Sequence, residues 1–296
     1  MEILGSNQPG VHGSSYGEEF LMTRRSFIPA ATGFAGLHAV AADQPIKRKG
    51  RLKQAATKGC FGKGMPLEDM CREAARLGLK GLDLSGPADW PTLRKYGLIS
   101  VMAPGASGIN HKQNHEKAEK QLITNLGLAA DAGMPSVIIT FATRQGISDA
   151  EATENSVAFL NRVKAVAEDK GVTICLEPFN SKVDHPDAQA DHTKFLVNIC
   201  KLVGSPRVKI LYDIYHMQIM EGDIIRTIRE NINHLGHFHT AGNPGRHEID
   251  DTQELNYRAI AQAIVDLNYT GYLGHEYSPL RDPLTSLDQA ITICDV

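Results

Sequence analysis

The strongest constraint on the fold is an alternation that begins near Arg51 and runs through the rest of the chain. Apolar runs of four to six residues alternate with longer stretches in which apolar residues recur every three or four positions. Runs of the first kind are typical of buried parallel strands, and stretches of the second kind are typical of amphipathic helices. We predict strands at residues 52–57, 81–84, 99–102, 136–140, 172–176, 208–212, 235–239 and 271–275.

The number of strands decides the architecture. Eight strand–helix units within residues 51–296 fit a (β/α)8 barrel, which typically has roughly 250 residues. No linker-like or low-complexity segment interrupts this part of the chain, so one domain is sufficient. A doubly wound open sheet is the alternative, but no G-x-G-x-x-G motif follows the first strand to support a dinucleotide site. We therefore predict the α/β class and a single (β/α)8 TIM barrel.

Composition favours a small-molecule partner. The chain has 31 Lys and Arg against 34 Asp and Glu, a net charge of −3, which gives no indication of a nucleic-acid partner. The five cysteines are an odd number, widely spaced and without a C-x-x-C pair, so neither a disulfide framework nor a thiolate zinc site is indicated. We expect them to be buried thiols. The oligomeric state stays open, and a homo-oligomer is possible.

Polar residues stand at the ends of the last four predicted strands: Glu177, Asp213, His239 and Glu276. In a parallel barrel the carboxyl ends of the strands open onto one face, where the chemistry is located. Three carboxylates and one imidazole form an oxygen-rich set that suits Mn²⁺ or Mg²⁺, with Co²⁺ or Zn²⁺ as possible substitutes. Any one of these residues alone could instead be satisfied by a backbone amide or a lysine. Four at consecutive strand ends favour a joint site for one divalent ion.

The segments around these residues resemble the hydroxypyruvate isomerase family, within the xylose isomerase-like barrels of sugar isomerases and epimerases. They are "LEPFN", "YDIYHMQIMEGD", "GHFHTAGNPGRHE" and "GYLGHEYSP". The resemblance covers the chain after about residue 51 and is sharpest over residues 177–279. It implies that the four residues hold the ion, that Glu177 and Glu276 also act as acid and base, and that His216 donates to a substrate oxygen.

One position loosens the substrate assignment. Some isomerases of this family carry glutamine where His239 stands, whereas ketose 3-epimerases carry histidine. Arg246, on the loop that follows, could bind a substrate carboxylate or hydroxyl, because a guanidinium offers a fork of donors. A surface arginine and a solvated histidine at a helix start are the alternatives for Arg246 and His216. Weaker candidates are His111, Lys112, His247 and Glu248.

The predicted chemistry is an isomerisation through an enediolate, as in the conversion of hydroxypyruvate to tartronate semialdehyde. A divalent ion stabilises the negative charge that develops, while one carboxylate removes a proton and another returns it. A ketose 3-epimerase, or another sugar epimerase, is the nearest alternative. An abasic-site endonuclease shares this barrel type but would need extra histidines for a multi-zinc cluster and a basic groove. A non-catalytic sugar-binding barrel is disfavoured by the intact set of ligands.

Residues 1–50 are expected to form a leader in front of the barrel domain at residues 51–296. The stretch from Met22 contains Arg24 and Arg25, a moderately apolar segment and a small-x-small sequence that ends at Ala41. This stretch resembles a twin-arginine signal peptide. Its apolar part is far shorter than the roughly 20 residues that span a bilayer, so no stable membrane anchor is expected.

The part of the leader before Met22 is polar and rich in glycine and serine, which is unusual for a signal peptide. We expect translation to start at Met22 and cleavage to occur near Ala41. The twin-arginine route exports folded proteins, which fits a protein that binds its metal before export. The expected location is therefore periplasmic or extracytoplasmic.

Overall fold

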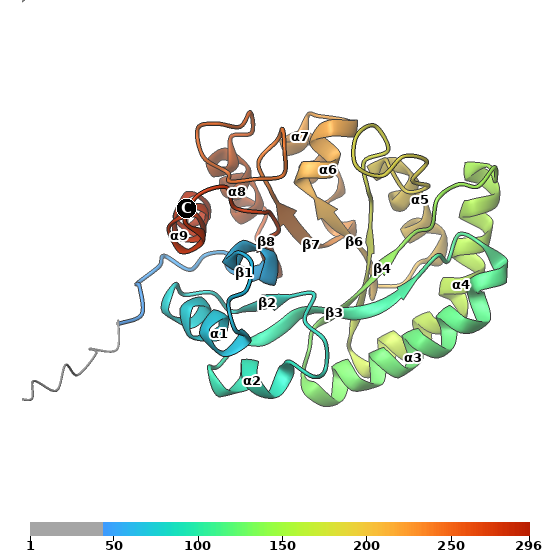
Figure 1. Ribbon diagram of the computed structural model, residues 1–296. Coiled ribbons are helices and arrows are strands. Elements are labelled where there is room, and N and C mark those ends of the chain that lie inside the picture. Colours follow the sequence, from blue (N-terminus) through green and yellow to red (C-terminus); the bar gives the residue numbers. More distant parts are fainter. Residues whose placement is uncertain (1–43) are drawn as a thin grey trace, which may run out of the picture. The chain divides into compact units, whose positions relative to one another are not determined.

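Eight parallel strands close into a barrel in the order β1 to β8, with helices around it (Figure 1). The computed structural model describes residues 44–296. The strands are β1 Lys53–Thr57, β2 Gly81–Asp83, β3 Ile99–Ser107, β4 Ser136–Thr140, β5 Thr173–Glu177, β6 Val208–Asp213, β7 Leu235–Thr240 and β8 Tyr272–His275. The predicted fold class is confirmed, and each predicted strand overlaps an observed one.

Helices follow the strands and form the outer layer (Figure 1). The α-helices are α1 Leu67–Arg76, α2 Trp90–Lys95, α3 His115–Ala132, α4 Asp149–Lys170, α5 Thr193–Val203, α6 Ile214–Met220, α7 Ile224–Asn231, α8 Tyr257–Asp266 and α9 Pro283–Cys294. Short 3₁₀ turns lie at Lys58–Phe61, Lys112–Asn114 and Ile232–His234. The end of α3 shows why the helices stop where they do, since Gly133 takes the left-handed conformation (φ 71°) that glycine adopts without strain.

The largest difference from the predicted strands is in β3, which was expected to end at residue 102 but continues to Ser107. The strand passes through Pro104, which has no backbone N–H to donate. Its register against β4 shifts between Ala103 and Ala106, and an irregularity of this kind is where a sheet tolerates proline. The proline therefore interrupts the regular ladder without ending the strand.

The two-residue period of the strands determines which side chains enter the barrel. Met102, Cys175 and Leu211 form a small buried cluster with Ile138, separate from the larger core. Glu177 is two residues beyond Cys175, and Asp213 is two residues beyond Leu211. Since side chains two apart share a face of a strand, the apolar cluster and the carboxylates form successive layers of one interior.

The five cysteines are buried and free, as predicted. Within residues 44–296, no helix is both long enough and apolar enough to cross a membrane. The predicted twin-arginine signal at residues 22–41 lies outside the described residues.

The close approach of β2 and β3 generates a stability prediction. A Cβ atom on Gly81 would lie 2.1 Å from the backbone oxygen of Ile99, whereas one on Gly127 in α3 would have no atom within 4 Å. Gly81→Ala should lower the free energy of unfolding by about 1 to 3 kcal/mol, because backbone atoms must shift. Gly127→Ala should raise it by about 0.5 to 1 kcal/mol through helix propensity. Urea denaturation of both variants measures the difference, and equal effects would contradict the close packing of β2.

Candidate metal centre

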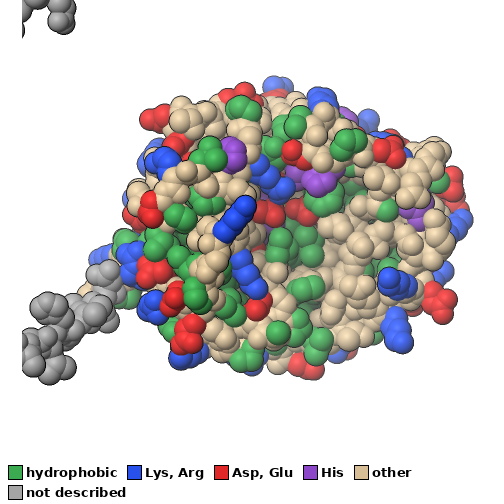
Figure 2. Space-filling view, viewed as in Figure 1, with side chains coloured by type: hydrophobic (Ala, Val, Ile, Leu, Met, Phe, Trp, Pro, Cys, Tyr) green, Lys and Arg blue, Asp and Glu red, His purple; other side chains and the backbone are tan. Residues whose placement is uncertain are grey.

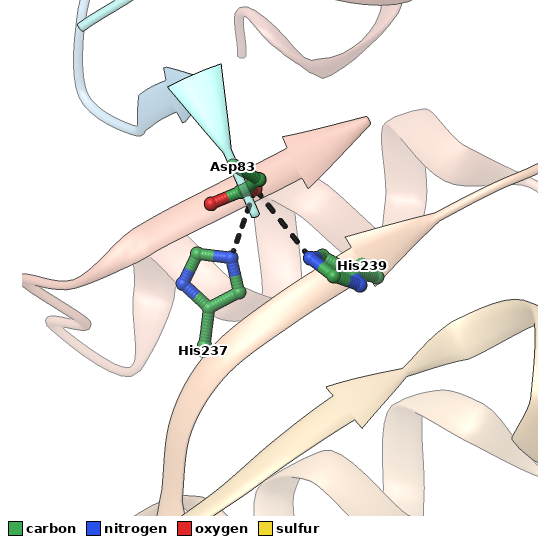
Figure 3. Close-up of side chains that lie close together, drawn as sticks. All are labelled: Asp83, His237 and His239. Atoms are coloured by element: carbon green, nitrogen blue, oxygen red, sulfur yellow. Dashed lines mark hydrogen bonds and ion pairs between the residues drawn. The ribbon is translucent and has the colours of Figure 1, made fainter. Parts of the chain in front are cut away.

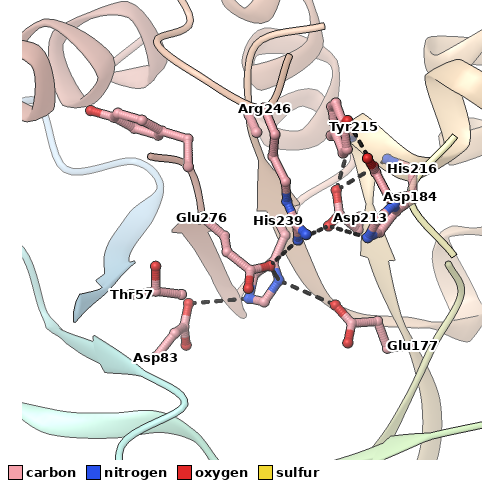
Figure 4. Close-up of polar contacts among 12 residues, drawn as sticks. Thr57, Asp83, Glu177, Asp184, Asp213, Tyr215, His216, His239, Arg246 and Glu276 are labelled. Carbon is pink, nitrogen blue, oxygen red and sulfur yellow. Dashed lines mark hydrogen bonds and ion pairs between the residues drawn. The ribbon is translucent and has the colours of Figure 1, made fainter. Parts of the chain in front are cut away.

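Four side chains from four consecutive strands meet at the carboxyl end of the barrel (Figure 4). Glu177 and Asp213 are the last residues of β5 and β6, His239 is next to last in β7, and Glu276 directly follows β8. One potential ligand atom from each lies within 4.8 Å of every other. The structure thus brings together the ligand set that the strand ends predict.

The imidazole of His239 lies among the carboxylates (Figure 4). Its Nδ1 is 2.9 Å from Glu276 Oε2 and 3.6 Å from Glu177 Oε1. The ring is fully buried, and Nδ1 has no well-aligned hydrogen-bond partner among the described residues. A buried imidazole nitrogen without a partner, facing two carboxylates, fits a ligand of a shared cation.

Asp213 uses its two oxygens for different purposes. Oδ1 accepts hydrogen bonds from the backbone N–H groups of Tyr215, at 2.9 Å, and His216, at 3.4 Å. These contacts cap the start of α6, a common role for aspartate. Oδ2 faces the site and lies 3.3 Å from Arg246 Nη2. The helix cap therefore fixes the carboxylate with one oxygen directed inward.

Arg246 bridges two members of the metal-ligand cluster, by which we mean Glu177, Asp213, His239 and Glu276. Its Nη2 is 2.9 Å from Glu276 Oε2 and 3.3 Å from Asp213 Oδ2, and its guanidinium lies 5.4 Å from the centre of the Tyr215 ring. Arg246 has a left-handed backbone conformation (φ 58°). The sequence predicts Arg246 at this site. It does not predict that Arg246 pairs directly with Asp213 and Glu276, two of the expected metal ligands.

The charges of the cluster shift the pKa values of its members. Burial, together with repulsion from Glu276, raises the pKa of Glu177. Burial also disfavours ionised Glu276, but the charges of His239 and Arg246 outweigh it and lower that pKa. The surrounding carboxylates raise the pKa of His239 well above its usual value, although burial opposes them. The site thus gathers three carboxylates that require positive charge.

The residues fit a divalent cation. Three carboxylates and one imidazole supply hard oxygen donors with one nitrogen, and no thiolate takes part. The crowding of the carboxylates around Nδ1 of His239 is relieved by a cation held among them. Glu177, Asp213, His239 and Glu276 would be its ligands.

A cavity of about 390 Å³ opens beside the cluster. It is lined by Thr57, Lys58, Gly59, Asp83, Leu84, Arg246, Glu276, Tyr277 and Ser278. Figure 2 shows acidic, basic and histidine side chains together in a hollow on the visible face. A cavity of this size accommodates a small metabolite, and its contact with Glu276 and Arg246 connects it to the cluster.

His216 is oriented by Asn180, a residue that the sequence analysis missed. Asn180 Oδ1 accepts hydrogen bonds from the backbone N–H groups of Val183 and Asp184, which fixes the direction of the amide. Its Nδ2 therefore donates to His216 Nδ1, at 2.7 Å. The hydrogen of the neutral ring must then be on Nε2, which is buried, has no hydrogen-bond partner among the described residues and lies 3.6 Å from Asp213 Oδ2.

Two further residues missed from the sequence lie beneath the cluster. Asp83, the last residue of β2, contacts His237 and His239 of β7. Burial raises the pKa of Asp83, but the charge of His237 and contacts with both histidines outweigh this and lower it. The strand-end rule that selects Glu177 would also have selected Asp83.

Three of the four weaker candidates have structural partners. His111 Nε2 lies 2.8 Å from the carbonyl oxygen of Thr143, and Glu248 accepts hydrogen bonds from the backbone N–H groups of Leu280 and Arg281. His247 Nδ1 contacts the carbonyl of Ser278, and Lys112 is exposed. Within residues 44–296, neither group of potential metal ligands includes any of these four residues.

Comparison with known proteins identifies the family of this chain. The model of the xylose isomerase-like TIM barrel matches residues 91–293. The chain belongs to this family. Over 245 residues it is 26% identical to a 2-oxo-tetronate isomerase of Pectobacterium atrosepticum, a match that covers 77% of this chain and 92% of that protein.

Matches of higher identity are shorter. The chain is 39% identical over 110 residues to a 2-oxo-tetronate isomerase of Cupriavidus necator, covering 37% of this chain and 42% of that protein. It is 36% identical over 108 residues to a hydroxypyruvate isomerase of Escherichia coli, covering 36% of this chain and 41% of that protein. These matches span less than half the length of either relative. The chain therefore has relatives that are named as isomerases.

Solved structures agree on the fold. An AP endonuclease, family 2, from Brucella melitensis superposes with a TM-score of 0.71 at 24% identity, covering 80% of this chain and 96% of that one. A D-psicose 3-epimerase, in the presence of D-fructose, gives 0.65 at 18% identity, covering 76% and 85%. At these identities the similarity shows the barrel alone.

The Asn180 contact predicts the tautomer of His216. Burial lowers the pKa of His216, so the ring should be neutral near pH 7, with its hydrogen on Nε2. Long-range ¹H–¹⁵N correlation spectra of the wild type should show this tautomer. Asn180→Asp should place a hydrogen on Nδ1, because a carboxylate accepts but cannot donate.

A matched substitution at a second buried asparagine provides the control. Asn155 is 2% exposed and donates to the backbone oxygen of Asn110, with no histidine as its hydrogen-bond partner. Asn155→Asp should leave the His216 signals unchanged. A wild-type ring protonated on Nδ1 alone would contradict the assigned orientation.

Proposed function

We propose that this protein is a divalent-metal-dependent isomerase of a small hydroxy-carbonyl compound, with the interconversion of hydroxypyruvate and tartronate semialdehyde as the leading reaction. The observation that carries the proposal is the meeting of Glu177, Asp213, His239 and Glu276 beside a cavity that Glu276 and Arg246 line. The isomerase names of the relatives support it. The preferred ion is Mn²⁺ or Mg²⁺, with Co²⁺ or Zn²⁺ as possible substitutes.

The two glutamates would serve as the acid and the base. They come from β5 and from the end of β8, and both face Nδ1 of His239. One carboxylate takes the proton from the carbon beside the substrate carbonyl, and the electrons of that C–H bond form the double bond of an enediolate. The other returns a proton to the former carbonyl carbon. The hydroxyl proton passes to the former carbonyl oxygen, so the new carbonyl forms at the carbon that lost its hydrogen. When bound, the metal ion would supply Lewis-acid stabilisation of the negative charge that develops.

Two further side chains would orient the substrate. His216 presents its Nε2 hydrogen toward the cluster and would donate to a substrate oxygen. Arg246 lines the cavity and would bind a substrate carboxylate or hydroxyl through its guanidinium. Because Arg246 also pairs with Asp213 and Glu276, it would hold the substrate close to the acid–base groups.

Each glutamate can be tested by an isosteric substitution. Glu177→Gln and Glu276→Gln should each lower kcat by about 10²- to 10⁴-fold, because an amide cannot exchange the proton. The rates are measured with Mn²⁺ at saturating hydroxypyruvate. Glu168→Gln is a control, since Glu168 lies in α4, outside the cluster, and accepts a hydrogen bond from the Ser205 hydroxyl. Activity within tenfold of the wild type in both site variants would remove the glutamates from the mechanism.

A ketose 3-epimerase is the second candidate, favoured by the histidine at position 239. An epimerase removes and returns the proton at one carbon, whereas an isomerase moves it to the neighbouring carbon. We expect turnover of hydroxypyruvate in D₂O with deuterium on the carbon that receives the proton, and no exchange at C3 of free ketohexoses. Exchange confined to C3 of a ketohexose would favour the epimerase. Metal binding without exchange in either substrate would indicate a non-catalytic barrel.

A further inference from the structure

A buried carboxylate lies behind the imidazole of the metal centre. Asp83 extends from the end of β2 into the barrel, where its Oδ2 is 3.2 Å from His237 Nε2 and 3.5 Å from His239 Nε2 (Figure 3). All three residues are at most 1% exposed. A carboxylate that enters such an interior must be compensated by partners, and among residues 44–296 these two imidazoles are its ion-pair partners.

The contact depends on a glycine in β8. Gly274 pairs in register with His239 of β7. A Cβ atom at Gly274 would lie 1.8 Å from Asp83 Oδ2 and 3.1 Å from His239 Cδ2. No side chain fits at this position while Asp83 reaches His239. The sequence therefore leaves a space in β8 that the carboxylate of β2 occupies.

The two nitrogens of His239 face opposite environments (Figure 4). Nδ1 faces Glu276 and Glu177, whereas Nε2 faces Asp83. A neutral imidazole has one hydrogen, and it binds a metal only through the nitrogen that lacks it. A carboxylate 3.5 Å from Nε2 favours the hydrogen on that nitrogen, which would leave the lone pair of Nδ1 for the ion.

We infer that Asp83 is a positioning residue, which fixes His239 in the orientation and tautomer that bind the cation through Nδ1. His237 contacts the same oxygen of Asp83 and holds the carboxylate in place. This inference rests on the proposed function, since it requires an ion at the four ligands. Partners of this kind at metal-bound histidines contribute about 10- to 100-fold to metal affinity.

The same three residues could instead hold a second ion, since Asp83, His237 and His239 also offer ligand atoms within 4.8 Å of one another. The geometry favours the positioning role. His239 directs Nδ1 at the larger cluster and then carries its hydrogen on Nε2. This leaves the second group only the carboxylate of Asp83 and the imidazole of His237, both buried. The number of ions bound per chain separates the two arrangements.

Asp83→Asn tests the inference through metal affinity, which does not depend on turnover. Titration calorimetry with Mn²⁺ should give one ion per chain for wild type and variant, with a Kd about 10- to 100-fold weaker in the variant. Asp191→Asn is the matched control, because Asp191 is also buried and lies 2.7 Å from Nδ1 of His192, outside the cluster. Its Kd should equal that of the wild type.

The outcomes are distinguishable. An unchanged Kd in Asp83→Asn, or two ions per wild-type chain, would overturn the positioning role. No binding of Mn²⁺ or Mg²⁺ to the wild type would instead overturn the proposed function.

A second measurement covers the case in which Asp83→Asn does not fold. ¹H–¹⁵N spectra of the Mg²⁺-bound wild type should show His239 with its hydrogen on Nε2. A hydrogen on Nδ1 would overturn the inference.

Discussion

Three carboxylates converge at one end of the barrel. They lie so close together that they repel one another when all are ionised, unless positive charge lies among them. Glu177, Asp213 and Glu276 offer oxygens within 4.8 Å of one another. At an effective dielectric constant of about 20, each such pair repels by about 3 to 4 kcal/mol at that separation. The closed barrel prevents the strands from separating, so positive charge must come to the site. Arg246 and His239 supply part of it, and a divalent ion would supply the rest.

A second layer of polar residues controls how the histidines are presented. Asn180 sets the hydrogen of His216 on Nε2, and Asp83 faces Nε2 of His239 from the opposite side of the barrel. In both cases a buried side chain contacts one ring nitrogen of the histidine, and the other ring nitrogen faces the cluster. Such residues make no contact with an ion themselves, yet they determine whether a nitrogen acts as a donor or as a ligand.

Much of this organisation could be predicted from the sequence, because strand period and strand order are local properties. Eight apolar runs predict eight strands. A polar residue at the end of a run, such as Glu177 or Asp213, is then expected at the carboxyl end of the barrel. The contact between Asp83 and His239 could not be predicted, because it crosses a closed barrel and depends on the space left at Gly274. The length of β3 was also missed, since its passage through Pro104 requires a register shift against β4.

One cation is expected among the side chains at the carboxyl ends of β5 to β8. A crystal structure of the Mn²⁺-loaded protein, with anomalous scattering recorded at the manganese edge, tests it most directly. We expect one strong peak at about 2 Å from ligand atoms of Glu177, Asp213, His239 and Glu276. A peak elsewhere, or no peak among these four residues at saturating Mn²⁺, would contradict it.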